Sequence, residues 1–164
     1  NAGIAGPMSK IVDMPVERIE KTFAINTVGA FIAAQEAVRR LSTRLGGNGG
    51  AIVNMSSMAA KAGAPNDGTD YGASKGAIDT LTVGLAKEVA GEGIRVNAVR
   101  PGLIYTEIHA AMGQPDRVDR LKTAIPMLRG GTPEEVGETV LWLLSEQASY
   151  ITGQLVDVAG GRAL

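Results

Sequence analysis

The sequence predicts an α/β fold in which parallel strands alternate with helices. Two short apolar runs, Ala51–Met55 and Ile94–Val99, are bounded by glycines and fit buried strands. A long helical pattern, Tyr71–Val89, lies between them, and this order makes a βαβ unit with a parallel sheet. In open α/β sheets, ligands bind outside the carboxyl ends of the strands. We therefore expect a site where these two strands end.

The remaining elements follow from helix and turn signals. Apolar residues at helical spacing predict a helix over Val16–Leu41. Thr132-Pro-Glu-Glu135 combines a capping hydroxyl, a proline in the first turn and a glutamate that completes a capping box, so another helix runs from there to about Ser145. A last strand lies near Gln154–Val158. Leu103–Met127 has weak periodicity, and we expect a mobile loop with short helices over the crevice.

Composition and charge exclude several functional classes. Lys+Arg 16 against Asp+Glu 17 gives a formal net charge of -1, which offers no electrostatic attraction for nucleic acid or an anionic membrane. Cysteine is absent, which excludes disulfides and thiolate metal sites, and we expect no metal in the site. No apolar run reaches membrane-spanning length, and residues 1–5 have no signal-peptide pattern. We expect one domain, residues 1–164, in the cytoplasm.

The stretch Tyr71-Gly-Ala-Ser-Lys75 places a phenol and an ammonium on one helical face, because side chains at i and i+4 are neighbours. A tyrosine whose pKa is lowered can donate or accept a proton near neutral pH. Ser57 follows the first strand at its carboxyl end, so it belongs to the same rim as the start of the Tyr71 helix and the Pro101-Gly102 turn.

Together these motifs resemble the classical short-chain dehydrogenase/reductase family over essentially the whole chain. The matching motifs, in the family's order, are Asn1-Ala-Gly3, Asn26, Ile52-Val-Asn-Met-Ser-Ser57, Tyr71-x-x-x-Lys75, Arg95-Val-Asn-Ala-Val99, Pro101-Gly-Leu-Ile-Tyr-Thr106, Thr132-Pro-Glu-Glu-Val136 and Asp157-Val-Ala-Gly-Gly161. The resemblance implies a Rossmann-like doubly wound parallel sheet. It also implies an NAD(P)-dependent oxidoreductase that interconverts a carbonyl and an alcohol by hydride transfer.

Carried over residue by residue, the resemblance implies four catalytic residues. Tyr71 would be the general acid/base, and Lys75 its partner, which also bonds the nicotinamide ribose. Ser57 would hold the substrate oxygen, and Asn26 would keep a water that links Lys75 to solvent. The implied cofactor-binding residues are Asn1, Ala2, Gly3, Tyr71, Lys75, Pro101, Gly102, Ile104 and Thr106.

The resemblance also implies the partners of the chain. The cofactor would be NADP or NAD, with a slight preference for NADP, and the substrate a small-molecule carbonyl or alcohol. The helices at 16–41 and 71–89 would form a homo-oligomer, a dimer or a tetramer.

One motif of the family has no counterpart. Its glycine-rich cofactor turn lies upstream of the Asn-Ala-Gly motif, whereas Gly47-Asn-Gly49 and Gly91-Glu-Gly93 precede strands. A phosphate-binding turn must follow a strand and open a helix. We therefore expect a domain that is incomplete at its amino terminus. The alternatives are a non-catalytic remnant or assembly subunit of the same fold, and an epimerase or dehydratase that keeps the cofactor.

The Tyr71 pKa provides an expectation of its own. Lowering a phenol pKa from about 10 to about 7 requires about 4 kcal/mol. An ammonium about 4 Å away in bulk water supplies only about 1 kcal/mol. We expect partial desolvation of the site and the positive nicotinamide ring to complete the shift, so that the Tyr71 pKa depends on bound cofactor.

Four residues also have simpler interpretations. Ser57 fits a helix cap or a turn. Asn26 fits a solvent-facing position within a helix. We expect His109 to be an ordinary surface residue, and Trp142 to lie in the core or a subunit interface.

Overall fold

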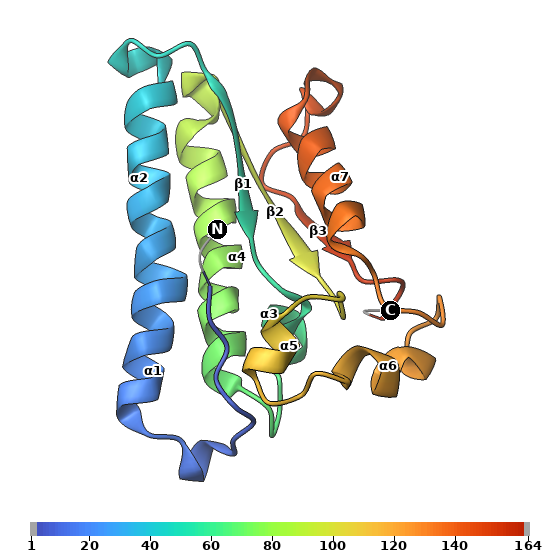
Figure 1. Ribbon diagram of the computed structural model, residues 1–164. Helices are drawn as coiled ribbons and strands as arrows, with labels where there is room; N and C mark the ends of the chain where they lie inside the picture. The colour runs from blue at the N-terminus through green and yellow to red at the C-terminus, as the bar shows by residue number, and fades with distance from the viewer. Residues whose placement is uncertain (1–2, 163–164) are drawn as a thin grey trace.

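The computed structural model describes residues 3–162 as a three-stranded parallel sheet with helices on both faces (Figure 1). The strands are β1 (Gly50–Met55), β2 (Ile94–Pro101) and β3 (Leu155–Val158), in the order β1-β2-β3. In this register Val53 lies opposite Asn97, and Val99 lies opposite Val156. The predicted α/β class and the parallel strand pairing are confirmed.

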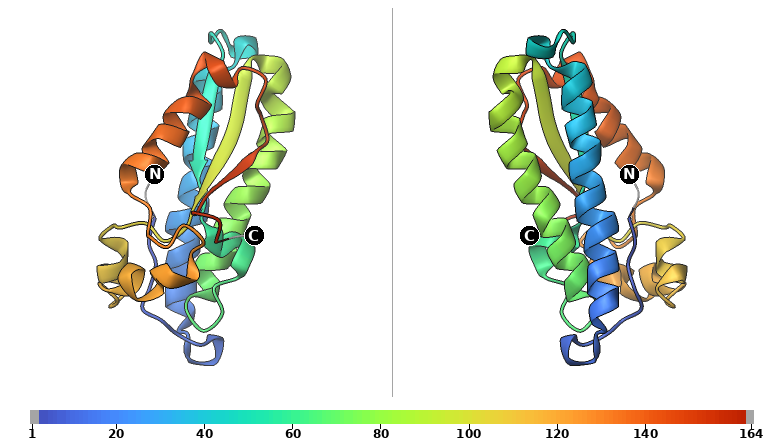
Figure 2. Two further views of the ribbon diagram at one scale, coloured as in Figure 1. Left: turned by 90° about the vertical axis from the view of Figure 1, so that its right-hand side faces the viewer. Right: turned by 90° about the vertical axis from the view of Figure 1, so that its left-hand side faces the viewer.

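Three long helices form the outer layers. Helices α2 (Gly29–Leu41) and α4 (Thr69–Val89) lie side by side on one face of the sheet, and α7 (Pro133–Leu144) covers the other face (Figure 2). The predicted capping box of α7 is present, because Thr132 and Glu135 exchange both side-chain hydrogen bonds. The shorter helices are α1 (Val16–Phe23), α3 (Met58–Ala62), α5 (Ile108–Ala111) and α6 (Arg117–Leu121), with 3-10 turns at Ile11–Asp13, Thr43–Leu45, Ala90–Glu92, Lys122–Ala124 and Glu146–Ala148.

The helix predicted over residues 16–41 is not uniform. A π-helical segment, Ala24–Val28, separates α1 from α2. Such wide turns occur frequently at functional sites. Asn26 lies within this segment and is only 2% exposed, so the solvent-facing interpretation of Asn26 is wrong.

The core lies on both faces of the sheet. Against α4, the cluster consists of Ala86, Val89, Ile94 and Val96. Against α7, it consists of Val99, Ile104, Val136 and Leu143. Strand β2 contributes Ile94 and Val96 to the first cluster and Val99 to the second, so the central strand is covered on both faces. The central strand is therefore rigidly held, and its carboxyl end is a fixed reference for the site.

The segment after β2 folds into α5 and α6 over the carboxyl ends of the strands, around a small core of Leu103, Val118 and Ile125 (Figure 1). The expectation that His109 lies on the surface is wrong, because the residue is 9% exposed and therefore buried. Trp142 of α7 is 44% exposed, so it does not lie in the core, and its expected place in a subunit interface stays a prediction. Among residues 3–162, no helix is both long and apolar enough to cross a membrane.

Candidate active site

Three chain segments meet at the carboxyl ends of the strands. Ser56 and Ser57 follow β1 directly, and the Ser56 N–H donates to the Val99 carbonyl of β2 at 2.9 Å. This bond extends the pairing of the two strands by one step. Helix α4 begins at Thr69, so Tyr71 stands in its first turn at the same rim. The predicted assembly of these segments at one edge is therefore present.

Ser57 has two roles in the local geometry. Its backbone is extended, and its hydroxyl accepts the Ala59 N–H at 3.1 Å as the N-cap of α3. The same side chain lowers the pKa of the Tyr71 phenol, so the two groups lie near each other. The capping interpretation is thus correct, and it places the Ser57 hydroxyl beside the phenol. Ser56 instead points inward, where its hydroxyl donates to the Lys75 carbonyl at 3.2 Å.

Lys75 is buried beside Tyr71. Its Nζ lies 5.8 Å from the centroid of the Tyr71 ring and donates to the Met55 carbonyl at 2.8 Å. The residue is 7% exposed, so its ammonium has exchanged most of its hydration for this one carbonyl and its neighbours. The end of β1 therefore fixes the direction of the Lys75 side chain.

Burial sets the proton affinities of this pair. It raises the pKa of the Tyr71 phenol, and the hydrogen bond from Ser57 opposes this only in part. Burial lowers the pKa of Lys75, and the Asp79 carboxylate opposes that shift. Removal from water disfavours the charged form of each group. The expectation that desolvation would help to lower the Tyr71 pKa is therefore wrong for this site without a cofactor.

Asn26 connects the π-helical segment to the site. Its side-chain amide accepts from the Ile4 N–H at 2.8 Å and donates to the Ile4 carbonyl at 2.9 Å and to the Ser74 hydroxyl at 3.0 Å. A Cβ placed on Gly3 would lie 3.6 Å from both Asn26 Oδ1 and Lys75 Nζ. Gly3 therefore adjoins the site, whereas Asn1 and Ala2 lie outside the described residues.

The residues expected to hold the nicotinamide follow β2. Gly102 approaches the end of β3 so closely that a Cβ there would lie 2.8 Å from the Ala159 Cβ and 2.9 Å from its Cα. The Ile104 side chain packs into the core against α7, so only its backbone can face a ligand. The Ile104 carbonyl oxygen already lies 2.9 Å from His109 Nε2. Thr106 is exposed, and no described contact joins it to Tyr71.

Sequence reasoning missed an ion pair at the first turn of α4. The Arg18 guanidinium donates two hydrogen bonds to the Asp70 carboxylate, at 2.9 and 3.0 Å, and Thr22 donates a third at 3.1 Å. The Asp70 side chain is 1% exposed. Arg18 and Thr22 are four residues apart on α1, and this spacing next to an aspartate that precedes Tyr71 was the available signal.

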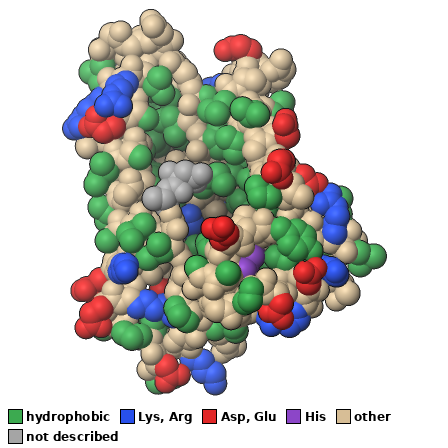
Figure 3. Space-filling view, viewed as in Figure 1, with side chains coloured by type: hydrophobic (Ala, Val, Ile, Leu, Met, Phe, Trp, Pro, Cys, Tyr) green, Lys and Arg blue, Asp and Glu red, His purple; other side chains and the backbone are tan. Residues whose placement is uncertain are grey.

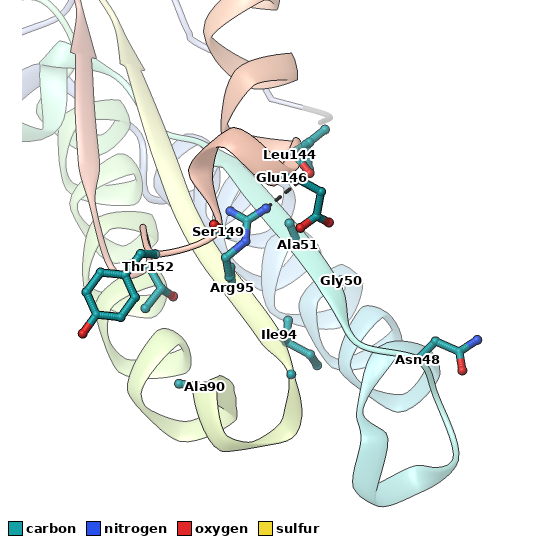
Figure 4. Close-up of a pocket in the computed structure, with 12 residues that line it drawn as sticks. Asn48, Gly50, Ala51, Ala90, Ile94, Arg95, Leu144, Glu146, Ser149 and Thr152 are labelled. Carbon is teal, nitrogen blue, oxygen red and sulfur yellow. Dashed lines mark hydrogen bonds between the residues drawn. The ribbon is translucent and has the colours of Figure 1, made fainter.

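A large cavity lies away from this group of residues. It has a volume of about 680 Å³ at the amino ends of β1 and β2. There Arg95 points to the carboxyl end of α7 and donates to the Leu144 carbonyl at 3.3 Å (Figure 4). Arg95 there compensates the unpaired carbonyls of the last helical turn. The chemistry of Ser57, Tyr71 and Lys75 lies at the opposite ends of the strands, so cavity size does not identify the site.

A family model described as enoyl-(acyl carrier protein) reductase matches residues 1–163. The oxidoreductase YgfF of Escherichia coli, itself uncharacterised, is 54% identical over 162 residues, which are 99% of this chain and 66% of that protein. The 3-ketoacyl-(acyl-carrier-protein) reductase of Brucella melitensis, solved with NADH, superposes with a TM-score of 0.90 at 29% identity, over 100% of this chain and 65% of that one. The protein ElxO, solved as a variant with NADPH bound, gives 0.87 at 30% identity, over 99% and 64%.

The chain spans between about half and two thirds of the length of the curated relatives that it matches. Within residues 3–162, no glycine-rich turn follows a strand and opens a helix. The part of the fold that is described thus contains Ser57, Tyr71 and Lys75 and the carboxyl ends of three strands.

Proposed function

The chain belongs to the short-chain dehydrogenase/reductase family of oxidoreductases, and from that premise we propose that it contributes the catalytic residues of an NAD(P)-dependent enzyme that interconverts a carbonyl and an alcohol. The observation that carries this proposal is the contact of Ser57 with Tyr71 beside the buried Lys75. A phenol, a hydroxyl and an ammonium converge there on one small region.

The side chains of the site suit the nicotinamide end of a dinucleotide. Lys75 Nζ and Asn26 Oδ1 flank the open side of Gly3, and both can bond ribose hydroxyls or an ordered water. The turn at Pro101-Gly102, with Ile104 and Thr106, would line the carboxamide side. The nicotinamide, when bound, supplies or accepts the hydride at the substrate carbon.

The residues of the chain would handle the proton. In the direction of reduction, the Tyr71 hydroxyl donates its proton to the substrate oxygen, and in oxidation the phenolate takes it back. The Ser57 hydroxyl donates a hydrogen bond to the same oxygen and holds it within reach of the phenol. Lys75 stabilises the phenolate by its charge, and Asn26 orders the path by which the proton is replaced. Positioned acid/base catalysis of this kind contributes about 10² to 10⁴-fold to a rate.

The test uses the protein together with NADH, NADPH and a panel of aldehydes, ketones and alcohols, followed at the absorbance of the reduced nicotinamide. We expect turnover that Tyr71→Phe lowers by about 10² or more while fluorescence titration shows unchanged nicotinamide binding. Turnover that survives in Tyr71→Phe would refute the role of Tyr71. Absence of nicotinamide binding would favour the non-catalytic remnant or assembly subunit.

Two measurements test the predicted cofactor preference and the predicted assembly. Comparison of NADH with NADPH decides the cofactor preference, for which we favour NADP. Light scattering in solution tests the homo-oligomer, a dimer or a tetramer. The observation in favour of assembly is that Val28, Phe31 and Ile32 are at least half exposed on the helices at 16–41, and Figure 3 shows hydrophobic side chains along that edge. One domain over residues 1–164 and a cytoplasmic location stay predictions.

A further inference from the structure

The face of α4 that carries Tyr71 and Lys75 continues to a third ionisable residue, Asp79. The three residues follow one another at intervals of four, so they form one stripe along the helix. Asp79 was not among the residues that the sequence motifs indicated. Its position one turn beyond Lys75 brings an anionic group to the side of the ammonium that faces away from the phenol.

Arg100 holds the Asp79 side chain. Its Nη1 lies 3.4 Å from Asp79 Oδ2, and both side chains are 15% exposed. Arg100 is the last residue but one of β2, so this contact ties α4 to the central strand near its carboxyl end. The other Asp79 oxygen, Oδ1, is buried and has no hydrogen-bond partner among the described residues. An oxygen in that state keeps its negative potential available to nearby cations.

Arg100 is in turn fixed from β3. Its Nε donates to Asp157 Oδ1 at 2.6 Å, and its Nη2 donates to the Leu155 carbonyl at 3.4 Å. Lys61 of α3 lies 3.4 Å from the other oxygen of Asp157. The charges therefore alternate in sign from Lys75 through Asp79, Arg100 and Asp157 to Lys61. Tyr71 and Asp79 are the ionisable groups of α4 next to Lys75, and Arg100, Asp157 and Lys61 are linked to it only through this series of ion pairs.

A buried ammonium with one carbonyl partner tends to lose its proton. The electrostatic attraction of Asp79 opposes that loss at Lys75. We propose that Asp79 acts in the reaction through Lys75, whose ammonium its negative charge stabilises beside Tyr71, while Arg100 fixes the Asp79 carboxylate. This inference rests on the proposed function, because Lys75 matters for catalysis only if Tyr71 transfers a proton.

The test titrates Lys75 itself, by NMR of ¹³C-labelled lysine side chains, with the Lys75 resonance identified by its loss in Lys75→Arg. In Asp79→Asn we expect the Lys75 midpoint to fall by about 0.5 to 1 pH unit. In Arg100→Gln we expect it to rise, because the carboxylate then acts on Lys75 without a competing cation. Asp79→Glu keeps the charge and should restore the midpoint of the native chain.

Glu88→Gln is the matched control. It removes one carboxylate from the exposed side of the same helix, about 20 Å from Lys75 at the rise of an α-helix, and should leave the midpoint unchanged. If Asp79 and Arg100 contributed to packing alone, Asp79→Asn and Arg100→Gln would both lower the free energy of unfolding, and the Lys75 midpoint would not shift in opposite directions. Equal midpoints in Asp79→Asn and Glu88→Gln, or shifts of one sign in Asp79→Asn and Arg100→Gln, would overturn the proposal. These midpoints are measured without turnover, so failure of this proposal is distinct from failure of the proposed function. In the turnover assay, Asp79→Asn is expected only to shift the pH profile.

Discussion

The Ser57 hydroxyl lies beside the Tyr71 phenol and lowers its pKa, although Ser57 caps α3 and Tyr71 stands in the first turn of another helix, α4. Because Ser57 is fixed by its own capping bond to Ala59, it acts as a rigid partner for the phenol. Two short segments after β1 thereby determine where a substrate oxygen could sit. The relationship also sets the proton affinity of Tyr71, which can be measured directly.

We expect the Tyr71 phenol to titrate above its ordinary pKa of 10.0 in the absence of cofactor, because burial raises its pKa. Ultraviolet titration of the native chain minus that of Tyr71→Phe isolates this group. Ser57→Ala should raise the pKa of Tyr71 further, and Ser56→Ala, which leaves the phenol untouched, should not. Since the folded pKa is the higher one, the contribution of Tyr71 to stability is complete below the unfolded pKa and is lost as the pH rises through the folded value. A Tyr71 midpoint at or below 10 would contradict this account.

The Arg18–Asp70 pair should anchor the first turn of α4. Asp70→Asn leaves the guanidinium with a weaker partner in a largely buried place, and we expect a loss on the order of 3 kcal/mol in the free energy of unfolding. Asp116→Asn breaks an exposed pair with Arg120 and should cost about 0.5 kcal/mol or less. Urea denaturation of the two variants checks the contrast, and equal losses would show that the buried pair is not an anchor.

The Arg18–Asp70 pair should also make the free energy of unfolding fall at acid pH. Burial raises the pKa of Asp70, but the hydrogen bonds from Arg18, the Tyr71 backbone and Thr22 outweigh it, so the pKa lies below its ordinary value of 3.8. Stability from Asp70 is therefore present above the unfolded pKa and is lost as the pH falls through the folded one. When the free energy of unfolding is measured from pH 5 downward, the part of the loss that comes from protonation of Asp70 should be missing in Asp70→Asn.

The parallel pairing of the first two strands and the convergence of Ser57, Tyr71 and Lys75 could be predicted from the sequence, because strand ends and helical spacing are local signals. The π-helical segment around Asn26 could not, because Asn26 there makes paired hydrogen bonds with Ile4, which is 22 residues away in the sequence. The rise of the Tyr71 pKa in the absence of cofactor could not be predicted for a similar reason. Spacing placed a cation beside the phenol, but only the packed structure shows how much water the phenol loses.

Gly102 should tolerate no side chain. A Cβ there would meet the Ala159 Cβ at 2.8 Å and its backbone Cα at 2.9 Å, so the loop after β2 would have to move away from the end of β3. We expect Gly102→Ala to lose about 1 to 3 kcal/mol of stability. Adding Ala159→Gly should recover only part of it, since the clash with the backbone of residue 159 remains. Gly76→Ala, at a helical position with open space, serves as the control and should be neutral or slightly stabilising. Full recovery in the double variant would mean that the two backbones are not in close approach.

His109 should make the stability of the segment after β2, which contains α5 and α6, sensitive to pH. Its Nε2 lies 2.9 Å from the Ile104 carbonyl oxygen, so the neutral ring carries its proton on Nε2, while Nδ1 is buried without a partner among residues 3–162. Only a small area of this single histidine reaches the surface in Figure 3. Protonation would place a charge on Nδ1 where no described acceptor meets it.

Burial, together with the nearby Arg117, therefore lowers the pKa of His109 below 6.5, although the Ile104 carbonyl and Asp67 oppose the shift. Because the folded pKa is the lower one, the stabilising contribution is complete above the unfolded pKa and is lost as the pH falls through the folded value. With one histidine in the chain, its ring resonance gives the midpoint without ambiguity. We expect the free energy of unfolding to fall from pH 7 to pH 5 more steeply in the native chain than in His109→Gln, which can still donate to Ile104 but does not titrate. Equal slopes of the unfolding free energy in the native chain and in His109→Gln, or a titration midpoint of the His109 ring at or above 6.5, would mean that His109 is in contact with water rather than buried by the segment with α5 and α6.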